Sequence, residues 1–309
     1  MELRVLEYFL AVAREQSILG AAESLHLSQP TLSRQLKDLE TELGKQLFLR
    51  GNRKITLTEE GMILRKRAEE ILDLVRKTED EVACSDDAVS GEIYIGAAET
   101  DAIHLIARTA KQLRNEYPQL RFRISSGDAC DVLELLDKGL IDFGVLFEPL
   151  SLEKYNHLTL PVRDTWGVLM RRDSPLAANE SVSPEDLWGK PLILSRQYKD
   201  GSDLSLWLGR NLSDLNVAAT YSLIYNGSIL VDEGIGYALC LDHVINTCGN
   251  SHICFRPLSP KLEIGSQLIW KRYQVHSRAA QLFLDRLQES LQSPINPSLT
   301  ARGLHSVPQ

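Results

Sequence analysis

The first 45 residues constrain the fold most, because short apolar repeats in them are separated by clear helix ends. Residues 3–14 and 18–25 place leucine and alanine at helical spacing, and a third helix is predicted between Ser28 and Gly44. Serine caps helix N-termini and glycine ends helices. The third helix carries one apolar stripe, made by Leu32, Leu36, Leu39 and Leu43. These features predict a compact three-helix unit.

The second and third helices predict a helix-turn-helix, whose later helix enters the major groove of DNA. After Gly44, two β-like runs at 46–49 and 54–57 predict a wing around residues 50–53. The stretch 45–54 carries four basic residues and no acid, although the whole chain has a net charge of −8, and such a cluster suits a phosphate backbone. The predicted DNA contacts are Ser28, Gln29, Thr31, Ser33, Arg34, Lys37, Arg50, Arg53 and Lys54.

An ordered series of short motifs runs through this segment: YFLAVA at 8–13, AAESL at 21–25, LSQPTLSRQ at 27–35, ELG at 42–44 and LTEEG at 57–61. Together they resemble the winged helix-turn-helix of the LysR-type transcriptional regulators. Residues 17–20 depart from the usual start of the second helix but remove no predicted contact. The resemblance implies a non-enzymatic regulator that binds a dyad-symmetric operator in double-stranded DNA, with RNA polymerase as a further partner.

A long charged helix is predicted after Thr58. Its apolar positions alternate at intervals of four and three, which is a heptad seam: Leu64, Ala68, Ile71, Val75, Thr78 and Val82. Such a seam either packs on its own domain or pairs with a second chain. In the resembled family this segment is the linker helix that pairs two subunits. We therefore expect a homodimer, which the resemblance extends to a homotetramer, and a hinge at 85–91.

The remaining two thirds alternate strands with helices. Strands at 92–97, 120–124 and 141–147, separated by helices at 101–117 and 131–138, predict a parallel βαβαβ lobe. A second lobe is predicted from strands at 166–170, 192–194, 217–223 and 237–241. The chain then returns through 267–271 to a last helix with Ala280, Leu284, Leu287 and Leu291 inward.

The expected fold class is α+β multidomain. A winged helix-turn-helix at 1–58 is followed by a linker helix and hinge at 59–90 and by an effector domain at 91–309. The effector domain resembles the two-lobed α/β periplasmic binding proteins, and its tail from about residue 293 is expected to be disordered.

A small-molecule effector is expected between the two lobes, because ligands of open sheets bind at the carboxyl ends of strands. The polar residues predicted there are Thr100, Asp128, Ser195, Arg196 and Asn226. Thr100 and Asp128 are equally well explained as helix caps. Acids around Asp128 leave the charge of the effector open.

Enzymatic chemistry is not expected, because the chain contains no G-x-x-x-x-G-K-[ST], H-E-x-x-H or G-x-S-x-G motif. Neither a cofactor nor a metal is expected. A thiol or metal sensor is the alternative for one group, Cys240, His243, Cys248, His252 and Cys254, although their spacing matches no standard metal site.

The expected location is the cytoplasm, without membrane association. The sequence has no apolar run near the ~18 residues of a membrane span, an acidic N-terminus and an odd, sparse set of five cysteines. Two other protein classes fit less well. One is a solute-binding or enzymatic α/β protein, and the other is an oligomeric scaffold whose helix-turn-helix contacts protein.

Overall fold

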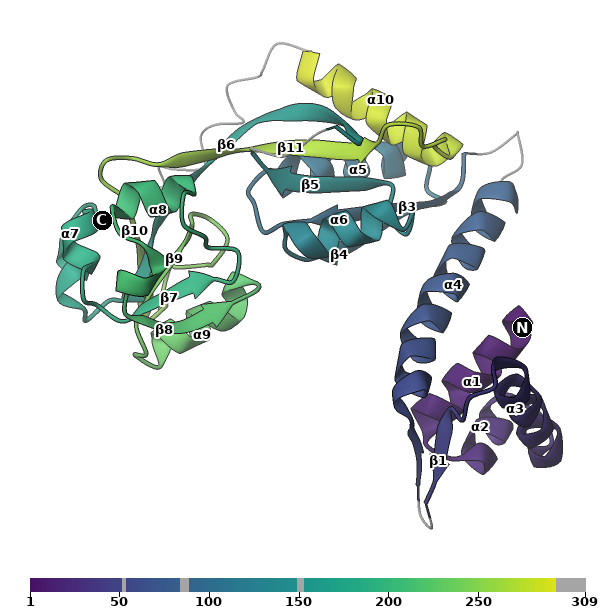
Figure 1. Ribbon diagram of the computed structural model, residues 1–309. Coiled ribbons are helices and arrows are strands. Elements are labelled where there is room, and N and C mark those ends of the chain that lie inside the picture. The colour runs from purple at the N-terminus through teal and green to yellow at the C-terminus, as the bar shows by residue number, and fades with distance from the viewer. Residues whose placement is uncertain (52–53, 84–88, 149–152, 293–309) are drawn as a thin grey trace. The chain divides into compact units, whose positions relative to one another are not determined.

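The computed structural model describes residues 1–51, 54–83, 89–148 and 153–292, and the chain divides into two compact units, Met1–Cys84 and Ser85–Gln309 (Figure 1). The long helix belongs to the first unit by its contacts, whereas the sequence had placed it in a segment of its own. The expected tail and most of the expected hinge lie outside the described residues.

The first unit begins with three helices, α1 (Leu3–Glu15), α2 (Ile18–Ser24) and α3 (Gln29–Leu43). The predicted ends of α3 are confirmed: Ser28 accepts a hydrogen bond from the Thr31 amide, and Gly44 has a left-handed backbone. Leu32, Leu36 and Leu39 are buried as predicted, but Leu43 is exposed because it lies in the last turn, beyond the core. Phe9 of α1 fills the centre of this core against Phe48.

The wing and the long helix follow directly. Strands β1 (Phe48–Arg50) and β2 (Ile55–Leu57) pair antiparallel, and α4 spans Glu59–Ala83. The Gly61 amide donates to the Thr58 hydroxyl at 3.0 Å, so Thr58 caps α4 as predicted.

The first half of the predicted heptad seam packs against the core of its own unit. Ala68 is fully buried, and Leu64 and Ile71 are partly buried, all against the core formed by α1, α3 and the wing. At Ala68 the chain's own core covers the seam, so the alternative in which the helix packs on its own domain describes this position. Pairing of two chains through the rest of the seam stays a prediction.

The second unit contains two lobes. In lobe 1, parallel strands β4 (Leu120–Ser126), β3 (Gly91–Ala97) and β5 (Phe143–Phe147) are extended by antiparallel β11 (Glu263–Lys271). Helices α5 (Ile103–Glu116) and α10 (Arg278–Gln292) cover one face, and α6 (Ala129–Asp137) covers the other. The predicted βαβαβ order is confirmed.

Lobe 2 has the same plan. Its parallel strands are β8 (Val217–Tyr221), β7 (Leu192–Ser195) and β9 (Tyr237–Leu241). Helices α7 (Pro184–Leu187) and α8 (Asp203–Leu208) pack on one face, and α9 (Ile224–Asp232) packs on the other. Strand β10 (Ile253–Pro257), α7, α8 and the short 3-10 helices Pro175–Ala178 and Leu212–Asp214 were not predicted.

One long strand joins the lobes. The sequence predicted a strand only from residue 166, after Pro161, whereas β6 runs from Tyr155 to Arg171. Its first part pairs with β11 and its second part pairs with β9 and β10 (Figure 1). Pro161 is tolerated because the β6–β11 register shifts between Gly265 and Ser266, where a bulge needs no ladder donor.

Among the described residues, no helix is both long and apolar enough to cross a membrane.

A glycine is required at position 61. A Cβ atom there would lie 2.2 Å from the Leu47 carbonyl oxygen, because α4 starts against the backbone just before β1. We expect Gly61→Ala to lower the free energy of unfolding of the full chain by ~1–3 kcal/mol, measured by urea denaturation. Gly20→Ala in α2 is the matched control, since its Cβ would make only ordinary contacts at 3.6 Å or more and alanine favours helix. An equal loss in both variants would contradict this account.

Candidate nucleic-acid interface and effector cleft

The outward face of α3 carries most of the predicted DNA contacts. Ser28, Gln29, Thr31, Arg34 and Lys37 are exposed, and Ser33 is half-buried. Because Leu32 and Leu36 hold the opposite face in the core, these side chains occupy the first turns of the helix together with its N-terminal amides. This arrangement suits insertion into a major groove.

The wing is fixed to the third helix by a carboxylate. Glu40 of α3 accepts hydrogen bonds from the amides of Leu47 (2.7 Å) and Phe48 (3.2 Å). The amide of Ile55 in β2 donates to the carbonyl of Gln16 at the end of α1. The wing and α3 therefore form one rigid surface.

The basic groups of this surface are available to a ligand. Arg34 is 83% exposed and only loosely paired with Asp38 at 3.9 Å. Lys37 and Lys54 are exposed and have no acidic partner among the described residues. The backbone of Arg50 ends β1, but its side chain and all of Arg53 lie outside the described residues. No acid occurs between Ser28 and Lys37, so this half of α3 favours phosphate.

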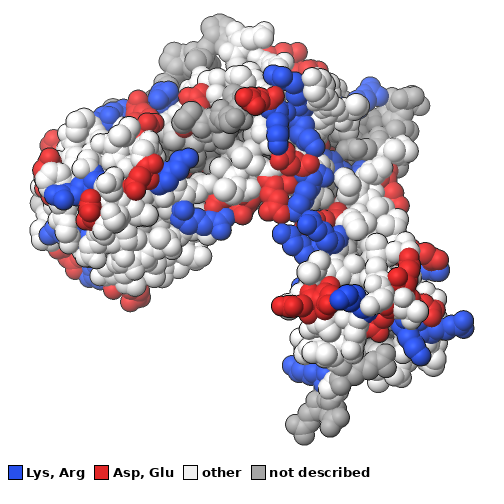
Figure 2. All heavy atoms as spheres, in the orientation of Figure 1, with Lys and Arg blue, Asp and Glu red and all other residues white. Residues whose placement is uncertain are grey.

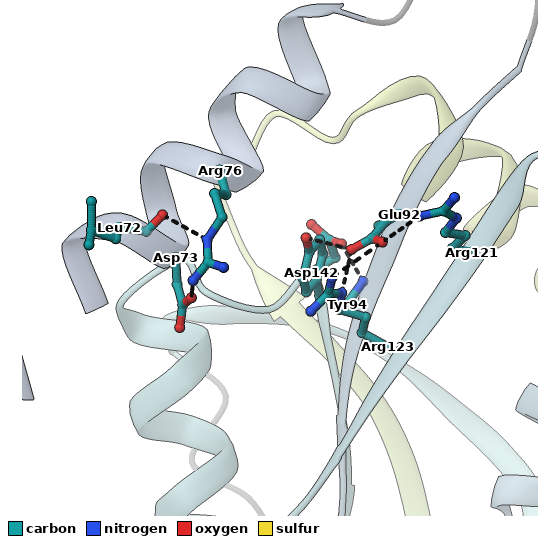
Figure 3. Close-up of polar contacts among 8 residues, drawn as sticks. All are labelled: Leu72, Asp73, Arg76, Glu92, Tyr94, Arg121, Arg123 and Asp142. Atoms are coloured by element: carbon teal, nitrogen blue, oxygen red, sulfur yellow. Dashed lines mark hydrogen bonds and ion pairs between the residues drawn. The ribbon is translucent and has the colours of Figure 1, made fainter. Parts of the chain in front are cut away.

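Several basic side chains elsewhere are closely paired with acids. In lobe 1, Glu92 accepts hydrogen bonds from Arg123 and from the Tyr94 hydroxyl (Figure 3). On α4, Arg76 binds Asp73, three residues earlier. Figure 2 shows acidic and basic groups intermingled on the face of each unit that is in view. The exposed basic side chains on α3 are therefore a local feature rather than part of a general basic surface.

Two of the predicted effector residues meet across the lobes. Arg196, directly after β7, donates from Nε to Asp128 and from Nη2 to Asp131 Oδ2 at 2.8 Å. The Asp128 side chain is only 5% exposed. Burial by itself would raise the pKa of Asp128, but the hydrogen bonds and charge of Arg196 outweigh burial and hold that pKa below its usual value. Asp128 also caps α6, so the predicted helix cap is confirmed and the same carboxylate lies at the contact between the lobes.

Thr100 faces the interior of the unit. Its hydroxyl donates to Asp164 Oδ2 at 2.5 Å and lies 3.2 Å from the Ser266 hydroxyl, while the Asp101 amide donates to Asp164 Oδ1. Burial raises the pKa of Asp164 despite these hydrogen bonds. Thr100 thus connects the start of α5 to the two crossing strands.

A second contact between the lobes involves Glu99. Its Oε2 accepts a hydrogen bond from the amide of Ile224, the first residue of α9, at 2.5 Å. Burial raises the pKa of Glu99, and the hydrogen bond from Ile224 only partly opposes this effect.

The other two predicted effector residues form no hydrogen bond across the lobes within the part of the chain that the structure describes. Ser195 ends β7 and accepts a hydrogen bond from the nearby Gln197 amide, and Asn226 is exposed in the first turn of α9. Sequence reasoning missed the roles of Asp131 and Asp164. Asp131 follows Asp128 at the spacing of a capping box, and this spacing is a sequence signal for the role of Asp131. No sequence signal marks Asp164.

The cysteine and histidine group of lobe 2 does not converge. Cys240 and Cys254 are buried, Cys248 is exposed, and burial raises the pKa of the Cys240 thiol well above its usual value. Among the described residues, no three His, Cys, Asp or Glu side chains form a group able to hold a metal ion. The structure therefore gives the sensor alternative no support at Cys240.

Comparisons with known proteins cover nearly the whole chain. Residues 3–62 match the bacterial regulatory helix-turn-helix proteins of the lysR family, and residues 86–292 match the LysR substrate binding domain. The chain is 26% identical over 291 residues to the uncharacterized HTH-type transcriptional regulator YvbU of Bacillus subtilis (strain 168), covering 94% of this chain and 98% of YvbU. It is 41% identical over 198 residues to the HTH-type transcriptional regulator BsdA of the same organism, covering 63% of this chain and 67% of BsdA.

A solved structure has the same fold. Full-length CbnR, crystallised in complex with its target DNA, superimposes with a TM-score of 0.70 at 19% sequence identity, covering 94% of this chain and 100% of CbnR.

Thr100→Val tests the buried network around Asp164. A carboxyl whose pKa is raised by folding makes the folded chain less stable once it ionises, so this cost grows as the pH rises through and above the usual value of 3.8. Loss of the Thr100 donor should increase the cost by ~1–3 kcal/mol at pH 7 and by much less near pH 4, measured as free energy of unfolding. Thr109→Val, which removes a hydroxyl bonded only to the Leu105 carbonyl, is the control. A loss for Thr100→Val that does not vary with pH would argue against this network.

Proposed function

Because this chain belongs to the LysR family of bacterial transcriptional regulators, we propose that the outward face of α3 reads a DNA operator and that the cleft between the lobes senses a small molecule. The chain is a DNA-binding regulator with an effector-binding domain, in a family of regulators rather than enzymes. In this proposal residues 1–58 bind DNA, 59–90 link and pair subunits, and 91–309 respond to the effector.

One observation carries the DNA-binding assignment: the first turns of α3 present exposed basic and amide side chains, and no acid occurs between Ser28 and Lys37. Gln29 has the geometry to pair with adenine, and Thr31 and Ser33 are short enough to contact base edges. Arg34 and Lys37, with Arg50, Arg53 and Lys54 of the wing, are assigned to phosphates or the adjacent minor groove. Two such units in a dimer would read the two halves of a dyad-symmetric operator.

Subunit pairing is assigned to a different face of α4 from the predicted seam. Ile63 (65% exposed) and Leu74 (43% exposed) are three helical turns apart and therefore share one face, which does not pack on the core of the first unit. Between them Arg67 and Glu70 pair with each other at 2.8 Å. This face supplies the apolar surface that a second copy of α4 would bury.

A second apolar surface supports a tetramer. In lobe 1, α5 and β4 form a groove of about 600 Å³ whose apolar lining includes Ile106, Phe122 and Ile124. In lobe 2, α9 exposes Tyr225 and Ile229. Two chains related by a two-fold axis could each place α9 in the groove of the other, so the contact would close on itself. Together with the α4 pair this gives a homotetramer.

We assign the protein to the cytoplasm, where bacterial operators lie, and treat RNA polymerase as the partner through which DNA binding would alter promoter activity. The effector residues in this proposal are Asp128 and Arg196, together with Ser195 and Asn226 of lobe 2. Thr100 belongs to the same set and acts through the buried network around Asp164.

Sequencing of the DNA fragments that the purified protein enriches from genomic DNA tests the function as a whole. Failure to enrich any sequence over input would reject it.

The DNA contacts are tested on a duplex enriched in that experiment. Arg34→Ala and Lys54→Ala should each weaken binding and reduce the slope of log affinity against log salt by about one unit, because each removes one phosphate contact. Gln29→Ala should instead change the preferred base at one position, worth ~1–3 kcal/mol. Arg108→Ala, an exposed arginine of α5, is the control and should bind as wild type. Unchanged slopes in both basic variants would move the DNA contacts elsewhere.

Assembly is tested by charged substitutions at two positions of α4 that differ in burial, the exposed Leu74 and the partly buried Ile71. Leu74→Asp should shift the oligomer toward monomers in light scattering while the melting temperature stays near wild type, because Leu74 is exposed in one chain. Ile71→Asp should instead destabilise the first unit by several kcal/mol, since Ile71 packs against its core. If Leu74→Asp keeps the wild-type mass and Ile71→Asp yields stable monomers, the original seam is the interface after all.

A further inference from the structure

The contacts across the cleft have a role beyond ligand binding. We propose that two contacts hold the lobes together when no effector is bound: Glu99 with the Ile224 amide, and Arg196 with Asp128 and Asp131. We call this pair of contacts the latch, and the effector acts by competing with it. The inference rests on the proposed function for its link to DNA. The latch itself is a property of the second unit and is measurable without DNA or effector.

Arg196 closes one side of the latch on a prepared receptor. Asp128 and Asp131 are locked in a capping box, in which Asp128 Oδ1 accepts from the amides of Cys130 and Asp131, and Asp131 Oδ2 accepts from the Asp128 amide. One oxygen of each carboxylate then receives the guanidinium from lobe 2. Because the α6 backbone already orients both acids, little ordering is needed when Arg196 binds.

Glu99 closes the other side by capping a helix of the opposite lobe. The residue before α9 is Leu223, whose side chain has no hydrogen-bond acceptor and makes no cap. The Ile224 amide is instead satisfied by the Glu99 carboxylate from the end of lobe 1. The start of α9 is therefore complete only while the lobes are together.

The two contacts of the latch are weak enough to break, because solvent reaches them. Arg196 is exposed and Glu99 is only half-buried, so water and salt reach both contacts. Among the described residues, the Ile224 N–H is the group that donates a hydrogen bond to Glu99, and burial raises the pKa of this carboxyl. The crossing strands β6 and β11 keep the lobes attached when the polar contacts break, with the register shift beside Gly265 as a place to flex.

Separation of the lobes is measured by single-molecule fluorescence transfer in the full-length protein without ligand. The dyes are attached at Ser290→Cys on α10 and Glu185→Cys on α7, both exposed, after Cys84→Ser, Cys130→Ser and Cys248→Ser. Labelled subunits are diluted with unlabelled protein so that only distances within one chain are read. Arg196→Ala and Glu99→Ala should each increase the ratio of separated to closed molecules by about tenfold, because each removes a charge-assisted hydrogen bond.

Matched controls separate the latch from general damage. Arg172→Ala removes an arginine that binds only carbonyls of its own lobe, Ser251 and Thr247, and Glu180→Gln removes an exposed acid of lobe 2. Both should keep the wild-type distribution. Hydrogen exchange at the Ile224 amide should accelerate in Glu99→Ala and not in Glu180→Gln.

A salt titration of wild-type protein makes the test independent of whether the variants fold. Raising the salt concentration to 0.5 M should separate the lobes in wild type and in Arg196→Lys. An unchanged distribution in salt and in every folded variant overturns the latch, whatever the DNA experiments give. Separation as expected, with no DNA enriched by the same protein, would keep the latch and reject the proposed function.

The effect of the latch on DNA binding is measured with the duplex enriched from genomic DNA. Arg196→Ala should shift its footprint or affinity at least threefold relative to wild type without ligand, while Arg172→Ala should not. Separated lobes with unchanged DNA binding would overturn the regulatory part of the inference.

Discussion

The antiparallel pairing of β6 with β11 is the constraint on which the second unit depends. Each lobe has three parallel strands of its own, and β6 joins both sheets along its length. Residues that follow the strands of one sheet contact residues that follow the strands of the other: Arg196 after β7 binds Asp128 after β4, and Glu99 after β3 accepts from the Ile224 amide after β8. The register shift at Gly265 places Asp164 beside Thr100 and Ser266, so the connection between the lobes also anchors the start of α5.

Local groups of charged residues describe this protein better than its net charge does. The chain is acidic overall, yet the first half of α3 has bases and no acid. Where the lobes meet, acids and hydrogen-bond donors face each other. Lobe 1 supplies Glu99, Asp128 and Asp131, and lobe 2 supplies Arg196 and the N-terminus of α9. The contacts between the lobes therefore join opposite charges, whereas the first half of α3 carries basic charge without an acid.

Sequence reasoning was most successful where structure depends on neighbours along the chain. The caps at Ser28, Thr58 and Gly44 follow from residue type and position, and the structure confirms them. It was least successful where one pattern fits two partners. A heptad on α4 describes a helix that packs on its own unit as well as one that packs on a second chain, and Ile71 belongs to the former.

The sequence by itself therefore determined the helices and strands of the first unit, the βαβαβ order of lobe 1, the caps of α3 and α4 and the outward residues of α3, because these depend on interactions within a few residues. In lobe 2 it missed β10, α7 and α8. Tertiary structure decided which apolar faces were already covered, whether Pro161 interrupts a strand, and where each cleft residue points. Thr100 and Asp164 are 64 residues apart, and Asp128 and Arg196 are 68 apart. Contacts at such separations depend on strand register and lobe packing, which residue types and spacing do not specify.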